Sequence, residues 1–299
     1  MKIYVFLMCL FPFALFSANF TFSGETWYDY TKYEINNINT SFSGYIPQFK
    51  YKYNNIDDVH DFSLIYSSKF IYDVKNSINE SKTYRSYLKY SYKDKFSTQI
   101  GLQKISFGNS LILRPLNWFD TLDYRTVAEH TQGVDAIKLN FYFLDYEVML
   151  WSILDDYNSY GLRYKRYINR GTFGLTFFHD RDKSNHSIYN TIQFIENQPE
   201  PQFPGSNYRI GFDYRYDNII GLWIEGNTIN SSLNDFNENR LDLITVGFDY
   251  TVPVYNGILL LSETMHSSIV SEDINILNQT FTAFMASTPI GMFNDLSLI

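Results

Sequence analysis

Cysteine is almost absent from this sequence. Of 299 residues one is a cysteine, Cys9, and it lies close to the N-terminus. A chain with no further cysteine cannot rely on disulfides for its stability. Long hydrophobic runs are missing as well, because no stretch after the N-terminus approaches eighteen consecutive apolar residues. The sequence therefore predicts no transmembrane helix beyond its first residues.

The motifs of the common enzyme classes are also missing. The sequence contains no G-x-S-x-G, no H-E-x-x-H, no P-loop and no calcium-loop pattern. Its five histidines do not have the spacing of metal ligands. We therefore expect no enzyme activity, no cofactor and no metal. The formal net charge of −8 argues against nucleic acid as a partner.

The first residues have the layout of a secretory signal peptide. Lys2 precedes an apolar run over 3–16, and two small residues follow it. This run is shorter than the roughly twenty residues that a membrane-spanning helix needs. We expect residues 1–18 to be removed, which takes away Lys2 and Cys9. The mature chain then has no cysteine, and losing the one positive charge of Lys2 changes the net charge from −8 to −9.

Aromatic residues are abundant, and they follow an alternating pattern. The chain has 26 Tyr, 26 Phe and 4 Trp, residues that suit strands and the boundary between water and lipid. Over 207–217, one parity is apolar, and the other carries Arg209, Gly211, Asp213 and Arg215. Similar alternation occurs over 61–73, 84–93 and 243–252. A period of two predicts strands that have one apolar and one polar face.

About fifteen segments of this kind are predicted, most of them ten to thirteen residues long. They begin near Phe20, Ser41, His60, Lys82, Phe96, Gly133, Leu144, Asn158, Gly171, His186, Asn207, Ile219, Arg240, Gly257 and Asn278, with an incomplete sixteenth expected from Ile290. Strands of globular proteins usually have about five or six residues, whereas crossing a bilayer at a tilt takes about nine to eleven. Long and short connections alternate except between about 181 and 240.

These lengths predict an all-β fold, a transmembrane antiparallel up-and-down β-barrel of about 16 strands that occupies residues 19–299 as one domain. A soluble sandwich or propeller is the competing architecture, since it also alternates apolar and polar positions. The chain stops at "FNDLSLI", whereas outer-membrane barrels usually finish on an aromatic residue. We therefore expect that the last strand or strands are lacking.

The stretch from 101 to 126 contains Gly101, Gln103, Ile105, Phe107 and Gly108, and then Pro115, Asn117 and Asp120. It resembles bacterial outer-membrane porin-like barrels, in which a strand of the form G-x-Q-x-aliphatic-x-aromatic-G precedes a segment rich in Pro, Asn and Asp. Residues 101–108 are read as the strand, and "QGVDAIKLNFYF" over 132–143 resembles the strand that re-enters the wall. The resemblance implies an outer-membrane location in contact with lipid, passage of small polar solutes and, since such barrels are often trimers, a homo-oligomer.

Within this reading, residues 109–131 form either a loop folded into the barrel or a cap over one mouth. Non-strand backbone is tolerated at membrane depth where it lines water. Charged side chains of this segment and of the polar strand faces would line the aqueous path and filter solutes by charge. The residues expected there are Arg114, Asp120, Asp123, Arg125, Arg85, Lys89, Arg209, Asp213 and Arg215. An ordinary exposed loop is the alternative.

Two further functional alternatives remain open. The first is a barrel that does not conduct and uses long loops for adhesion or binding. The second concerns His266 and Ser268, which a strand would place on one face. Barrel-type outer-membrane lipid hydrolases carry such a pair in an H-x-S-N motif, in which the histidine activates the serine. Here Ile269 follows the serine and the asparagine is missing, so the sequence favours passive diffusion over catalysis.

Overall fold

The computed structural model describes residues 18–33, 38–54, 59–73, 78–119, 131, 133–154, 156–181, 206–230, 240–254, 256–271, 274–290 and 294–298. The expected signal peptide lies outside them apart from Ala18. None of these residues forms a helix that could span a membrane. The chain divides into two compact units. Unit 1 comprises residues 1–104 and 122–142, and unit 2 comprises residues 105–121 and 143–299.

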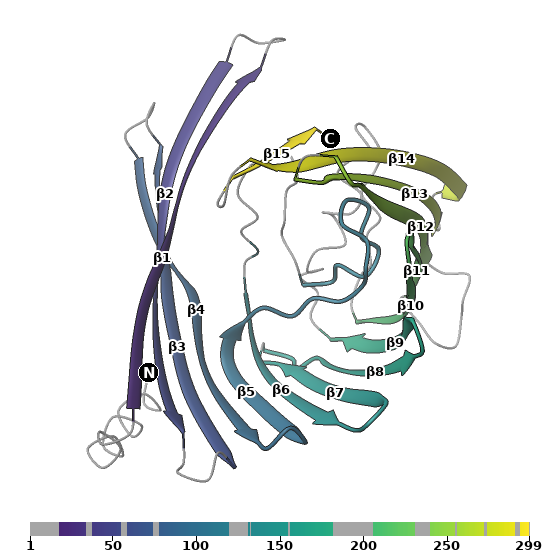
Figure 1. Ribbon diagram of the computed structural model, residues 1–299. Helices are drawn as coiled ribbons and strands as arrows, with labels where there is room; N and C mark the ends of the chain where they lie inside the picture. The colour runs from purple at the N-terminus through teal and green to yellow at the C-terminus, as the bar shows by residue number, and fades with distance from the viewer. Residues whose placement is uncertain are drawn as a thin grey trace. The chain divides into compact units, whose positions relative to one another are not determined.

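Unit 1 contains six strands, each paired antiparallel with the next in sequence. They are β1 (Ala18–Tyr33), β2 (Ile38–Asn54), β3 (His60–Asp73), β4 (Ile78–Tyr92), β5 (Phe96–Gln103) and β6 (Val134–Tyr142). The first four have 16, 17, 14 and 15 residues, which is longer than the expected ten to thirteen. Figure 1 shows these long strands as two successive hairpins. The alternation of side chains predicted their existence but not how far the pairing extends.

Unit 2 contains nine strands in the same up-and-down order. They are β7 (Tyr146–Ile153), β8 (Tyr160–Ile168), β9 (Gly171–Asp180), β10 (Asn207–Asp217), β11 (Gly221–Asn230), β12 (Arg240–Val252), β13 (Ile258–Ser271), β14 (Ile274–Ile290) and β15 (Asn294–Leu298). The described residues thus form fifteen strands, close to the expected number, and the prediction of an all-β antiparallel fold is confirmed.

The strand expected from His186 falls outside the described residues. However, β9 pairs directly with β10, and their other edges are taken by β8 and β11, so no strand comes between them. One end of unit 2 therefore has the connections 154–159, 181–206 and 231–239, and the other has 169–170 and 218–220. The alternation of long and short connections, which the sequence suggested would fail here, holds once this strand is left out.

The strand expected over 101–108 ends earlier, because β5 stops at Gln103. Side chains continue to alternate beyond it, and Ile105 and Phe107 are buried while Lys104 and Ser106 are exposed. A period of two reports which side a residue faces, and it does not report whether its backbone has a partner strand. The prediction was therefore wrong about the boundary, although it was right about the side-chain faces.

The two faces of the strands show an inverted burial pattern. On β10, Arg209 is 0% exposed, whereas its neighbour Ile210 is 44% exposed. The exposed face of unit 2 is apolar and includes Leu162, Leu175, Ile210, Leu222, Val246, Phe248 and Leu260. We call the opposite face, which carries Arg163, Arg209, Asp213, Glu225 and Glu263, the polar face. A soluble sandwich would bury the apolar face, so this pattern favours a barrel whose outer surface meets lipid.

Candidate functional site

Residues 105–119 cross the polar face of unit 2 without forming a strand. Figure 1 shows them inside the curve made by β7–β14. Aromatic side chains hold one part of this segment against β7 and β9. The rings of Phe107 and Trp151 lie 5.0 Å apart, and those of Phe119 and Phe178 also lie 5.0 Å apart. Trp118 stacks on Phe178 at 6.1 Å.

A second apolar contact holds the middle of the segment against β11–β13. Ile112 and Leu113 are buried in one cluster with side chains of the polar face. Those partners are Trp223, Ile229, Leu241, Leu243, Leu261, Met265 and Ile269. Burying each such side chain is worth about 1.5–3 kcal/mol relative to leaving it exposed. The segment is therefore packed against the strands like part of a protein core.

Two buried carboxylates bind the backbone of the same segment. Glu225 of β11 accepts hydrogen bonds from the N–H groups of Asn109 (2.7 Å) and Ser110 (3.2 Å). Glu263 of β13 accepts them from the N–H groups of the next three residues, 111–113, at 2.7, 2.9 and 2.5 Å. Both glutamates are 0% exposed. Five consecutive amides without a strand partner are thus satisfied by two side chains, which fixes the backbone of this segment on the polar face.

Gly108 makes the approach to Glu225 possible. Its φ of +84° lies in the left-handed region, which favours glycine. A Cβ at this position would lie 2.5 Å from Oε2 of Glu225. The chain therefore turns at Gly108, and the amides that follow reach the carboxylate.

Leu116 occupies a space that a glycine of β10 leaves open. A Cβ on Gly211 would lie 2.2 Å from Cδ2 of Leu116, which is 0% exposed. We expect Gly211→Ala to lower the free energy of unfolding by about 1–3 kcal/mol through overpacking, measured by denaturant unfolding. Gly24→Ala is the matched control, because the three atoms nearest to its Cβ all belong to the exposed side chain of Tyr45, which can swing aside.

A double-mutant cycle that combines Gly211→Ala with Leu116→Ala shows whether the loss of stability comes from this contact. If the contact is as described, Leu116→Ala removes the clash, and the two changes together cost less than the sum of the single costs. Strictly additive costs would contradict the seating of Leu116 against Gly211.

Three arginines of the polar face are each paired with acidic groups. Arg163 of β8 reaches across β9 to Asp213 of β10 at 2.7 Å. The other two arginines belong to β10, and each of them also pairs with an aspartate of another strand. Arg209 binds Asp180 of β9 at 2.5 Å, and Arg215 binds Asp249 of β12 at 2.8 Å and Asp217 of its own strand at 2.7 Å. On the described polar face of unit 2, the positive charges of these three arginines are therefore compensated by neighbouring aspartates.

The structure places the expected site residues as follows. Arg209, Asp213 and Arg215 come together on the polar face of unit 2. Arg114 lies half-buried within the segment 105–119. Asp120, Asp123 and Arg125 lie outside the described residues. Arg85 and Lys89 belong to β4 of unit 1. Arg85 is buried and donates to the carbonyl oxygens of Tyr84 (2.6 Å) and Thr131 (2.7 Å).

Sequence reasoning missed four residues of this arrangement. Glu225, Glu263, Arg163 and Asp180 were not identified as site residues, although they hold the segment or pair with the arginines. For the three residues other than Glu263, the available signal was the alternation of polar and apolar residues on β10, which would extend to β8, β9 and β11 if the strand register were known.

A small polar cavity opens beside the segment within unit 2. Its volume is about 170 Å³, and it lies between residues 106–109 and the strands β7, β8 and β10. The charged side chains that line it are Glu147, Arg163, Lys165 and Asp213. A cavity with this lining is suited to water and small polar molecules.

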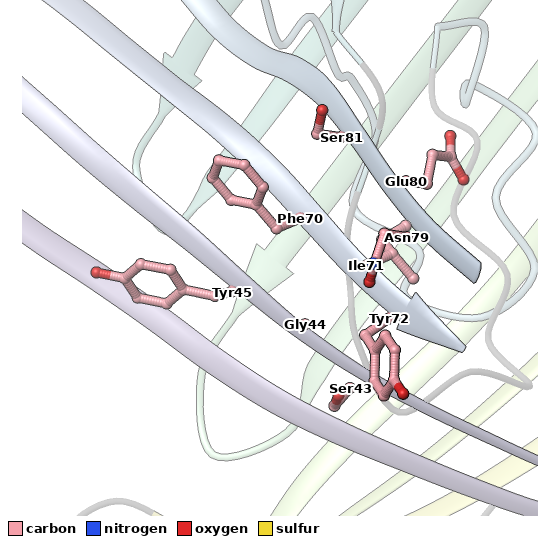
Figure 2. A pocket seen from close by; sticks show the side chains of 9 residues that line it. All are labelled: Ser43, Gly44, Tyr45, Phe70, Ile71, Tyr72, Asn79, Glu80 and Ser81. Atoms are coloured by element: carbon pink, nitrogen blue, oxygen red, sulfur yellow. The ribbon is translucent and has the colours of Figure 1, made fainter. Parts of the chain in front are cut away.

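A larger hollow, of about 510 Å³, lies on unit 1 over β2, β3 and β4. Figure 2 shows Tyr45 and Phe70 projecting from neighbouring strands, near Tyr72. All three rings are on the exposed face, with Asn79 and Ser81 beside them. Tyrosine combines an apolar ring with a polar hydroxyl, so this place suits a boundary between lipid and water.

His266 and Ser268 both project from the exposed side of β13, where Nδ1 of His266 lies 3.0 Å from Oγ1 of Thr280. This geometry does not test the expectation that the protein has no catalytic activity, which stays a prediction. Among the residues that the structure describes, no three His, Cys, Asp or Glu side chains gather as metal ligands would.

Comparison with known proteins gives no match to a family model and none to a curated protein sequence. Solved structures do match. OmpF of Salmonella typhi, in complex with daunomycin, has a TM-score of 0.62 at 8% identity over 92% of this chain and 86% of its own. OmpT, an outer membrane protein of Vibrio cholerae, has a TM-score of 0.59 at 9% identity over 94% and 84%. A mutant of the Rh. blastica porin reaches 0.56 at 10% identity over 93% of both chains.

The chain has the fold of the bacterial porins. The likeness extends over more than nine-tenths of its length, and the up-and-down antiparallel strand order agrees with it. The architecture is therefore a porin-like antiparallel β-barrel, and the resemblance noted in the sequence is confirmed at the level of fold. At 8–12% identity the likeness concerns the fold alone. In this porin-like fold, the residues on the polar face have to be judged by their own chemistry.

Proposed function

We propose that this chain is a channel of the bacterial outer membrane through which small polar solutes or ions cross by passive diffusion. The porin-like fold and the apolar exposed faces support a location in lipid. The polar faces would then line an aqueous lumen. No catalytic step and no cofactor belong to this proposal.

One observation carries the proposal. A non-strand segment with charged and polar side chains is fixed on the polar face by Glu225 and Glu263, beside a polar cavity. Irregular backbone at membrane depth is stable only where it is covered by protein or lines water. The strands of unit 2 cover one side of residues 105–119 and a polar cavity borders them, so in the proposed channel the segment would lie in the lumen.

The test is a planar-bilayer recording of the refolded chain from residue 19 onward. Discrete current steps are expected, with a unit conductance that rises in proportion to the salt concentration, because diffusion through a wide aqueous path does not saturate. Folding is checked first by the strand signal in circular dichroism. A folded protein that gives no steps would contradict the proposal and favour a closed barrel used for adhesion or binding. Saturating conductance would instead indicate a site in the path that binds the permeating ion.

A further inference from the structure

The cavity beside residues 106–109 has charges of both signs on its walls. Its lining includes Glu147 of β7, Lys165 of β8 and Asp213 of β10. In the ladder Glu147 is directly opposite Lys165, and Gly174 of β9 is directly opposite both Lys165 and Asp213. Residues that are opposite each other in this way share one face of the sheet. Negative, positive and negative side chains therefore follow one another across the strands, and Gly174 has no side chain to fill the space between the last two.

Two of the charged groups are already paired within the protein. Arg163 binds Asp213 at 2.7 Å, and the two side chains are 8% and 2% exposed. The guanidinium of Arg163 also donates to Oγ1 of Thr176 (2.5 Å) and lies 5.3 Å from the ring centre of Phe107. Asp213 accepts a further hydrogen bond from Nδ2 of Asn109 at 3.2 Å. Both charged groups are thus held by the protein itself, and they form a fixed wall of the cavity.

Glu147 and Lys165 are in a different position. Both are half-buried, and among the ion pairs of the residues that the structure describes, none joins these two opposite side chains. The ammonium of Lys165 lies 5.1 Å from the ring centre of Tyr167, which is 47% exposed. A cation–π contact at so exposed a ring is weak, so it does little to compete with a carboxylate ligand. The cavity therefore presents a carboxylate and an ammonium that are not paired with each other.

The size and the total charge of the lining restrict what the cavity can hold. Its volume is about 170 Å³. A cavity of about 150 Å³ holds a benzene molecule, and a free amino acid with a short side chain, such as alanine, has as many non-hydrogen atoms as benzene. The four charges of the lining, which are those of Glu147, Arg163, Lys165 and Asp213, sum to zero. A simple anion or cation would add an uncompensated charge, whereas a zwitterion would add none.

From this lining we infer that the cavity is a binding site for small zwitterionic solutes, which are free amino acids with a short side chain. Glu147 accepts hydrogen bonds from the ammonium group of the solute, and Lys165 donates to its carboxylate. Hydrogen bonds in which both partners are charged are among the stronger ones in proteins. The inference deepens the proposed function and rests on it, since an open channel is what would bring such a solute to the cavity.

The test is the binding of radiolabelled L-alanine to the chain from residue 19 onward, refolded in an uncharged detergent, by equilibrium dialysis at about pH 6, where an α-amino group is protonated. L-Lactate and L-alaninamide have the same size, but lactate carries a hydroxyl in place of the ammonium and alaninamide an amide in place of the carboxylate. Alanine should bind about tenfold or more tightly than either competitor, because each lacks one of the two charged contacts. Absent binding of alanine, or equal binding of all three, would overturn the inference.

Two variants assign the roles of the side chains. Glu147→Gln should abolish the preference for alanine over lactate and keep the preference over alaninamide, and Lys165→Met should do the reverse. A general loss of structure would weaken all three solutes alike. Asp145→Asn and Lys95→Met are the matched controls, because they remove the same charges at exposed positions outside the lining, and they should keep both preferences. Equal changes in these controls would contradict the assigned roles.

Binding in detergent and conduction in a bilayer are separate measurements, so each can fail alone. Current steps from a protein that does not bind alanine would overturn the site and support the channel. Alanine binding by a folded protein that gives no current steps would support the site and contradict the channel.

Discussion

Replacing Arg209 by methionine is expected to lower the free energy of unfolding by about 3–5 kcal/mol, because it removes the cation that is paired with the buried carboxylate of Asp180. Arg209 is 0% exposed, and its guanidinium binds Asp180 at 2.5 Å and Oδ1 of Asn207 at 2.9 Å. Asp180 is 2% exposed. After the change, the carboxylate stays buried without the opposite charge of Arg209. Denaturant unfolding in detergent or lipid measures the loss.

Two variants show whether the pairing itself is responsible. Arg209→Met with Asp180→Leu replaces the buried pair by apolar groups and should recover most of the lost stability. Arg240→Met breaks an ion pair with Asp242 that is 38% and 32% exposed, and it should cost no more than about 1 kcal/mol. If Arg209→Met lies within 1 kcal/mol of wild type, the buried pair does not contribute as described.

The second large effect concerns the attachment of residues 105–119. Glu263→Ala removes the acceptor of three backbone N–H groups at 111–113. The donors of Ile112 and Leu113 are buried, and each one left unsatisfied costs about 1–3 kcal/mol. We expect the backbone at 111–113 to loosen from the polar face, while the apolar contacts on either side and the paired strands stay in place. In bilayer recordings the unit current should rise and become noisy, and limited proteolysis should cut near 109–113.

Variants that preserve part of the contact test this account. Glu263→Gln keeps a carbonyl oxygen as acceptor but loses the charge, so it should fall between wild type and Glu263→Ala. Glu147→Ala is the matched control, since it removes a carboxylate from the lining of the adjacent cavity on β7. It should leave the segment resistant to protease. A quiet, unchanged current in Glu263→Ala would show that the segment is held by its apolar contacts alone.

The strands were largely predictable, because a face that meets lipid and a face that meets polar groups impose a period of two on every strand. This signal located β10 well, where Ile210 and Arg209 differ so sharply in exposure. It failed at 104–108, where side chains alternate without a partner strand. It also suggested a strand from His186 that has no place between β9 and β10. Alternation describes side-chain faces, and pairing requires knowledge of the neighbouring strand.

The attachment of the segment could not be predicted in the same way. On β13 the polar face carries Leu261, Met265 and Ile269 around Glu263, so the strand does not read as half polar. A single glutamate among apolar residues gives no indication of its partners, which lie about 150 residues earlier in the chain. Likewise, Arg163 and Asp213 are separated by a whole strand, β9. Such contacts depend on the register of several strands, which one sequence does not provide.

In the proposed channel, residues 105–119 lie on a polar face that borders an aqueous path. The mature chain is expected to have no cysteine, so a single introduced one can be labelled selectively. Ser106→Cys places a thiol at the cavity beside the segment, and Leu222→Cys places one on the exposed apolar face. A water-soluble methanethiosulfonate reagent, added during single-channel recording, should lower the unit current of Ser106→Cys in one step and leave Leu222→Cys unchanged. An unchanged current after mass spectrometry has confirmed the modified Ser106→Cys would contradict the claim.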